Sequence, residues 1–297
     1  MVSIEIGPAF GWPNCCRLAN DLIDLVVTTD VGPRVMRCGF RDGPNHFAVN
    51  GALQGQTGGD AWRAYGGHRL WHAPESFPRS YAPDNGPVTL ERLADGVRVI
   101  QPVEPATGIQ KEMDFRLAPA AAQVRVAHRL RNHTPWPVEL APWALSVMAA
   151  GGVAILPLPP RRPHSPANLL PTSQLTLWPY TDLADPRWTF GTRYVLLRQD
   201  PARSAYQKIG LRQVDGWAAY ARAGELFVKT FAADPAARYP DFDTTCEVFV
   251  DEAMLELETL GPLTQLAPGA AVEHVEHWHL LRDVPAPGSD ADVDALR

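Results

Sequence analysis

Apolar and polar residues alternate with a period of two along much of the chain, a pattern typical of half-buried β-strands. In Gln123–Asn132, for example, Val124 and Val126 fall on one face while Arg125 and Arg129 fall on the other. Because such segments recur from end to end, the pattern predicts an all-β chain with many antiparallel strands. The other segments with this pattern are Asp24–Thr29, Val35–Phe40, Val88–Leu93, Val97–Val103, Ile109–Leu117, Val138–Met148, Tyr194–Arg198, Glu225–Phe231, Glu247–Val250, Met254–Leu260 and Val272–Leu281.

Turn-forming pairs, among them two Asp-Gly pairs and one Pro-Gly pair, separate these segments. The 29 prolines are scattered, which suits strands joined by loops and argues against long helices. The sequence contains no amphipathic helix of three turns and no internal repeat. We therefore predict a large antiparallel double-sheet sandwich or a closed barrel in one domain, residues 1–283, and a polar C-terminal tail, residues 284–297. The proline-rich segment 157–200 is expected to form long loops beside a binding site.

One uncharged run, Ala141–Leu158, is long enough to raise the possibility of a membrane span. Pro142, a Gly-Gly pair at 151–152 and Pro157 interrupt it, so the run predicts two buried strands around a glycine turn. The N-terminus has no basic stretch followed by an apolar one, and this argues against a cleaved secretion signal.

The net charge of −6 and the isoelectric point near 5.8 describe a mildly acidic protein. Its one compact basic cluster, Arg161, Arg162 and His164, is too small to indicate binding to nucleic acid or to an anionic membrane. The four cysteines have neither a disulfide pattern nor zinc-ligand spacing. These features predict a cytoplasmic protein with a small-molecule partner and no cofactor, and they leave the oligomeric state open.

Several segments together resemble the galactose-mutarotase-like, or aldose 1-epimerase-like, superfamily. They follow one another through most of residues 20–282, although each motif is short. The resemblance implies a β-sandwich with a sugar cleft on one sheet and an isomerase that interconverts sugar anomers. The segments that carry it are Leu25–Met36, Arg63–Glu75, Pro83–Val88, Leu130–Pro137 with Leu140–Trp143, and Leu255–Leu260 with Trp278 behind it.

Interconversion of anomers requires a base for the proton of the anomeric hydroxyl and an acid for the ring oxygen. By resemblance, Glu258 lies where the family's catalytic carboxylate arises, within the run Leu257-Glu258-Thr259. Apolar neighbours would raise its pKa towards a useful range. Glu256 shares its strand face, so alternation cannot choose between the two. The competing interpretation is a solvated strand edge that carries several acids.

The acid is harder to assign, because the family's histidines fall near Asp84, Asn85 and Trp143, where this chain has none. His68 and His72 share one face of the strand before Pro74 and are the candidate replacements. Either histidine could instead be a packed, hydrogen-bonded core residue.

Sugar sites combine an aromatic platform with a few fixed polar groups. The aromatic candidates could each belong to the core instead, and Arg63 would favour an anionic sugar by bidentate pairing. The substrate-binding candidates are Trp71, Trp143 and Trp278 with Arg63, Arg69, Asp84, Asn85 and Lys111.

The stretch with His274, His277 and His279 is the one candidate for a metal site in the sequence. On a strand, only His277 and His279 share a face, and two imidazoles need a third ligand from elsewhere, so we predict no metal. Two alternatives to the isomerase stay open: a non-catalytic carbohydrate- or metabolite-binding sandwich, and metal-assisted isomerase or lyase chemistry on a sugar-like substrate.

Overall fold

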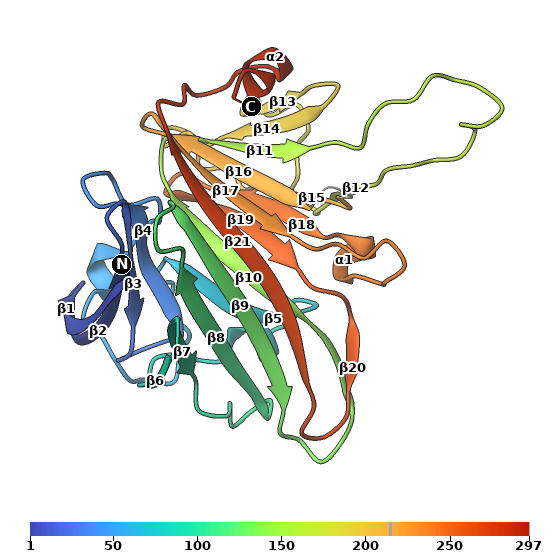
Figure 1. Cartoon of the computed structure of the whole chain (residues 1–297). Helices are drawn as coiled ribbons and strands as arrows, with labels where there is room; N and C mark the ends of the chain where they lie inside the picture. Colours follow the sequence, from blue (N-terminus) through green and yellow to red (C-terminus); the bar gives the residue numbers. More distant parts are fainter. Residues whose placement is uncertain (214–215, 297) are drawn as a thin grey trace.

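Two large antiparallel sheets pack face to face in the computed structural model, which describes residues 1–213 and 216–296 (Figure 1). One sheet has eleven strands and the other has ten. This arrangement confirms the predicted double-sheet sandwich.

The eleven-stranded sheet is built mainly from the N-terminal part of the chain and from strands near residues 140 and 255. Strand Thr264–Leu266 (β20) pairs with Val138–Ala149 (β10) and lies outside the continuous row of neighbouring strands. In spatial order the other strands are Ser3–Ala9 (β1), Trp12–Ala19 (β2), Ile23–Thr28 (β3), Arg34–Phe40 (β4), His68–Ala73 (β5), Val138–Ala149 (β10), Met254–Leu260 (β19), Cys246–Val250 (β18), Gln207–Leu211 (β15) and Leu175–Leu177 (β12).

The ten-stranded sheet has β21 near its centre, paired with β17 on one side and β9 on the other. In spatial order its strands are Trp188–Phe190 (β13), Tyr194–Arg198 (β14), Val153–Pro157 (β11), Trp217–Arg222 (β16), Glu225–Phe231 (β17), Ala271–Arg282 (β21), Gln123–Asn132 (β9), Ile109–Leu117 (β8), Gly96–Ile100 (β7) and Thr89–Leu93 (β6).

The main hydrophobic core lies between the two sheets. Leu70 and Leu257 of the first sheet join the same buried cluster as Phe227 and Trp278 of the second. Since side chains alternate along a strand, Trp71 points the opposite way from Leu70 and belongs to a separate cluster. We call the face of the eleven-stranded sheet that points away from the main core its outer face.

Most of the predicted strands are present, and the uncharged run forms β10 and β11 on either side of residues 150–152. Strands β1, β2, β15 and β16 were not predicted. Segment 157–200 forms loops with only the short strands β12 and β13 besides β14, and residues 158–174 extend from the body as an arm (Figure 1).

The described helices are short, and the longest, Asp290–Asp294 (α2), has five residues. None of the helices in the described ranges could therefore cross a lipid bilayer. The others are the 3-10 turns Gly51–Leu53 (η1) and Arg79–Tyr81 (η2) and the turn Pro240–Asp243 (α1). Within the predicted tail, α2 buries Val293 and its Asp290 accepts hydrogen bonds from the backbone of Thr192 and Arg193.

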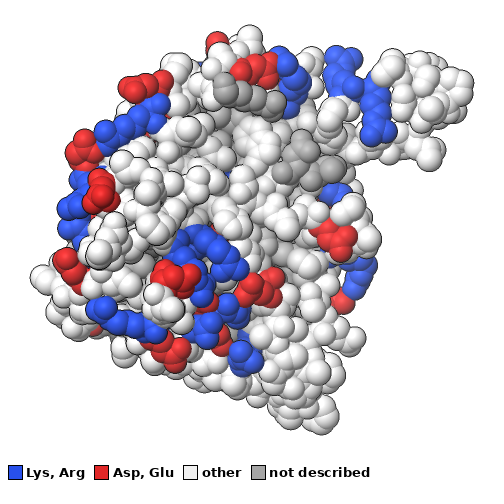
Figure 2. Space-filling model, in the orientation of Figure 1, with Lys and Arg blue, Asp and Glu red and all other residues white. Residues whose placement is uncertain are grey.

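Charged residues over β7, β8 and β9 are interleaved in sign on the face that Figure 2 shows. At their centre, buried Asp114 pairs with Arg98 at 2.7 Å and with Arg129 at 2.9 Å. Mutual pairing of this kind leaves little net positive potential on this surface.

Candidate functional site

Glu258 lies on the outer face of the eleven-stranded sheet and is completely buried. It pairs across the sheet with Leu145 of β10 on one side and with Glu247 of β18 on the other. Leu145 is in turn paired with Arg69 of β5. Residues paired directly in an antiparallel sheet project from the same face, so these four side chains form one row across the sheet.

An ammonium group lies between the two carboxyl groups of this row. Lys208 Nζ is 2.7 Å from Glu247 Oε2 and 3.1 Å from Glu258 Oε2. The indole Nε1 of Trp143 also donates to Glu258 Oε2, at 2.8 Å. Glu258 Oε1 has no hydrogen-bond partner among the described residues, which leaves one buried acceptor for a further donor. We call Glu247 and Glu258 the carboxyl pair, and Lys208 is the lysine between them.

Burial favours the protonated form of the carboxyl pair. It raises the pKa of Glu258 and raises that of Glu247 well above its ordinary value. Burial alone would lower the pKa of Lys208, but the two carboxylates outweigh it and raise the pKa well above normal. One ammonium can balance only one of the two carboxylates, so the pair favours a shared proton. Glu258 also accepts a hydrogen bond from the Trp143 indole, which favours the charged form of Glu258 over that of Glu247.

Aromatic rings surround the carboxyl pair. Lys208 Nζ lies 4.9 Å from the ring centroid of Trp143 and 4.7 Å from that of Trp178, which is a cation–π sandwich. Tyr206 stacks on Phe249 beside it, and Tyr180 meets the same Phe249 ring edge-on. Tyr180 and Tyr206 are both exposed, so the outer face presents aromatic surface to solvent next to the buried acids.

Arg69 of β5 extends the site across the sheet. It pairs with Glu256 at 2.9 Å and lies over the ring of Trp71, 4.5 Å from its centroid. Trp71 meets both Trp143 and Trp62 edge-on. The structure thus brings four predicted residues, Glu258, Arg69, Trp71 and Trp143, onto one face.

His68 does not belong to this face, and the predicted pairing of His68 with Glu258 is wrong. His68 pairs with Ser146 across the sheet and points into the main core, where its Nδ1 lies 2.8 Å from Ser146 Oγ. Its Nε2 contacts His128 Nε2 of the opposite sheet at 2.7 Å. The physical reason is strand alternation, because Ser146 neighbours Leu145, which shares the face of Glu258.

His72 lies on the same inner face as His68, so its pairing with Glu258 is also contradicted. Its Nε2 lies 3.3 Å from Glu104 Oε2, and Lys111 binds the other oxygen of Glu104 at 2.6 Å. His72 and Lys111 therefore belong together in a second polar cluster, away from the carboxyl pair.

The remaining predicted residues have structural partners. Trp278 is buried in the main core and donates to Glu276. Asp84 forms a buried ion pair with Arg34 at 2.8 Å, and Asn85 donates to the backbone oxygens of residues 59 and 61. Arg63 donates to the backbone oxygen of Thr57 and to the Tyr65 hydroxyl within its own loop. None of these contacts involves Glu258.

The histidines of β21 split between the faces of the ten-stranded sheet, with His274 buried and His277 exposed. In the core, donor atoms of His68, His128 and Glu276 lie within 4.8 Å of one another. Lys229, Thr259 and Trp278 already occupy the Glu276 oxygens, and the two imidazole nitrogens bond each other. Hydrogen bonds therefore account for this cluster without an ion.

Sequence reasoning missed Lys208, Glu247 as a partner, and Trp178. Strand β15, which carries Lys208, was not predicted, because Gln207–Leu211 is short and includes Gly210. A lysine between apolar residues in a strand was the available signal, since lysine is rarely buried without an acidic partner.

Comparisons with known proteins identify the fold alone. No family model and no curated protein sequence matches the chain. Among solved structures, a galactose mutarotase-like protein from Clostridium acetobutylicum has a TM-score of 0.61 and 11% identity, over 95% of this chain and 99% of that one. A Klebsiella pneumoniae protein provisionally described as an aldose 1-epimerase also scores 0.61, at 12% identity, over 99% of this chain and 85% of that one. A galactose mutarotase-like protein from Lactobacillus casei scores 0.57 at 11% identity, over 90% of this chain and 100% of that one.

The superposition extends over nearly the whole chain, whereas the sequence identity is low. Identity at this level says nothing about retained chemistry, because this kind of sandwich serves many functions. The chain has the galactose-mutarotase-like fold.

Proposed function

We propose that this protein is a carbohydrate isomerase that interconverts sugar anomers on the outer face of the eleven-stranded sheet, with Glu258 as the general base. The single observation that carries the proposal is the carboxyl pair, in which buried Glu258 and Glu247 share one ammonium. Glu258 serves as the base in this proposal, and Glu247, whose pKa burial raises well above its ordinary value, serves as the acid.

In this mechanism the Glu258 carboxylate takes the proton from the anomeric hydroxyl. The bond between the anomeric carbon and the ring oxygen breaks, and the ring oxygen receives the proton of Glu247. The open aldehyde rotates and closes on its other face, which returns both protons. Lys208 stabilises the changing charge of the two carboxyl groups throughout, because it contacts both.

The aromatic rings supply the sugar-binding surface in this proposal. Tyr180, Tyr206 and Trp178 flank Lys208, and Trp71 lies across Trp143 on the β5 side. Apolar C–H faces of a pyranose pack on such rings, and Arg69 offers a charged donor beside them.

Access to the carboxyl pair requires local movement. Glu247 and Glu258 are fully buried, and Lys208 is 4% exposed. Trp178 covers Lys208, and the Thr181 hydroxyl donates to the backbone oxygen of Lys208, so segment 178–181 closes the site. A sugar reaches Glu258 when this segment moves aside.

A second candidate function is carbohydrate binding without catalysis. The observation that favours it is the burial of Glu258 under Lys208, together with the placement of His68 and His72 on the other face. In that case the exposed aromatic surface would hold a ligand while the carboxyl pair acts as a structural ion pair.

Proton NMR distinguishes the two candidates. The isomerase accelerates equilibration of freshly dissolved α-D-glucose, α-D-galactose or their 6-phosphates at catalytic protein concentration. A binding protein shifts its own melting temperature with one of these sugars but leaves the equilibration rate at the buffer value.

A further inference from the structure

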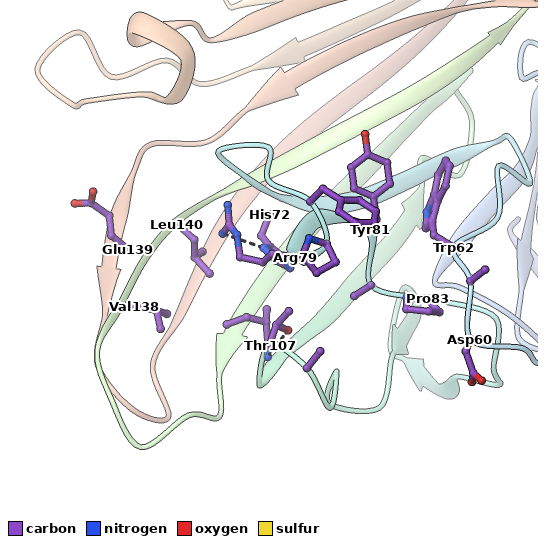
Figure 3. A pocket seen from close by; sticks show the side chains of 16 residues that line it. Asp60, Trp62, His72, Arg79, Tyr81, Pro83, Thr107, Val138, Glu139 and Leu140 are labelled. Atoms are coloured by element: carbon purple, nitrogen blue, oxygen red, sulfur yellow. Dashed lines mark hydrogen bonds between the residues drawn. The ribbon is translucent and has the colours of Figure 1, made fainter.

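A cavity separate from the carboxyl pair lies at the open end of the sandwich, beside β5. Its volume is about 840 Å³, within the range of small-molecule sites. It lies between the loop after β5, the β7–β8 loop and the start of β10. Figure 3 shows Leu140, His72, Tyr81 and Trp62 along one side and Thr107 opposite them.

The inner end of this cavity carries an unbalanced positive charge. Lys111 and Glu104 neutralise each other at 2.6 Å, and burial lowers the pKa of His72, which keeps this imidazole neutral. Arg79 has no carboxylate within ion-pair distance in the described part of the chain. An arginine stays protonated in proteins, so one guanidinium charge is left over.

Hydrogen bonds hold that guanidinium in place. Arg79 donates through Nη1 to His72 Nδ1 at 3.3 Å (Figure 3). It also donates through Nη2 to the backbone oxygen of Pro74. His72 then donates through Nε2 to Glu104. The guanidinium is fixed at the cavity wall by neutral acceptors and not by a counter-ion, and partial burial lowers its pKa.

The other walls are largely apolar. Trp62, Phe77 and Tyr81 contribute aromatic rings, and Phe77 is 82% exposed at the mouth. Ile109 and Leu140 supply aliphatic surface. The indole Nε1 of Trp62 is buried and has no hydrogen-bond partner among the described residues.

Two acids at the rim limit the charge that the cavity can take. Glu139 is paired with Arg238 at 2.6 Å, and Asp60 is exposed to solvent. These acids repel a ligand with several negative charges, whereas Arg79 attracts an anion. The balance fits one negative charge on an apolar body.

We propose that this cavity binds a small organic monocarboxylate with a flat apolar body. The carboxylate pairs with Arg79, and the body packs against Phe77, Tyr81 and Leu140. Arg79 and His72 belong to a different site from Glu258, because His72 points to the inner face and Glu258 to the outer one. The two sites share an aromatic wall, since Trp62 and Tyr81 also pack against Trp71.

Isothermal titration calorimetry tests this proposal with 3-phenylpropionate and its neutral amide as a matched pair. We expect saturable binding of the carboxylate, with the amide at least about tenfold weaker. Arg79→Gln should weaken carboxylate binding by a similar factor, and Ala106→Trp, at an exposed lining position, should block it. Arg203→Gln, at an exposed site elsewhere, is the control and should bind as the wild type does.

Equal affinity for acid and amide, unchanged binding by Arg79→Gln, or no binding at millimolar carboxylate would each overturn the proposal. Glu258→Gln separates the two hypotheses. It should leave carboxylate binding intact, whether or not the protein accelerates sugar equilibration.

Discussion

Glu258 and His68 lie on opposite faces of the same sheet, because their β10 partners, Leu145 and Ser146, are consecutive residues. Glu258 therefore meets Lys208 and Trp143, whereas His68 meets His128 of the other sheet. Any acid that works with Glu258 must come from the outer face, and Glu247, whose pKa burial raises, meets that condition.

Replacement of Lys208 should strongly destabilise the fold at alkaline pH. Lys208→Met leaves two buried carboxyl groups without their cation, and the loss of one partner of a buried ion pair costs about 3–5 kcal/mol. Urea denaturation at pH 8 measures the effect. Adding Glu247→Gln and Glu258→Gln removes both buried acids as well and should recover most of the loss. A triple variant as unstable as the single one would show that lost packing is the cause.

Glu247 should make stability fall as the pH rises. Its folded-state pKa lies well above the unfolded value of about 4.3, so the folded protein binds more protons in the window above that value. The stabilisation is complete below this window and is lost as the pH climbs through the folded-state pKa. Glu247→Gln should flatten this slope between pH 5 and 9 in thermal melts. An identical slope in the variant would show that Glu247 is ionised throughout.

The core histidines should make stability fall as the pH drops, opposite to the effect of Glu247. Burial lowers the pKa of His128, and lowers that of His274 to about 3. Because the unfolded chain takes up protons near pH 6.5, stability falls as the pH drops below that value. Each imidazole contributes up to about 1.4 kcal/mol per pH unit in this window. Chemical denaturation of Glu247→Gln at pH 7, 6 and 5 measures the slope without the opposing contribution of that carboxyl group. Constant stability of this variant across the range would mean that the imidazoles are already charged in the fold.

Gly66 and Gly67, just before β5, should tolerate no side chain. Both have positive φ, at +88° and +72°, and an added Cβ would lie 2.3 Å from the backbone oxygen of Ala48 or of Val35. Alanine at either position should therefore destabilise the fold by more than about 1 kcal/mol. Gly86→Ala, where nothing lies within 4 Å, is the matched control. Equal melting temperatures for all three variants would contradict the crowding seen here.

The sequence pattern predicted the class of fold because alternation is a local property, and in Gln123–Asn132 it marks the strand directly. It also placed Arg69, Trp71 and Glu258 in strands. It could not show which face each residue uses, because facing depends on the register between β5, β10 and β19, which are distant in the chain. Lys208 was not identified because β15 was not predicted, and only the paired sheet brings it to Glu258.

The rate of α-D-galactose equilibration, followed by proton NMR with wild type, Glu258→Gln and His68→Asn at equal folded concentration, tests the central claim most directly. The outer-face site predicts that Glu258→Gln reduces the acceleration to the buffer rate, while His68→Asn retains it wherever circular dichroism shows the variant folded. Loss of acceleration in folded His68→Asn with full activity in Glu258→Gln would contradict the account.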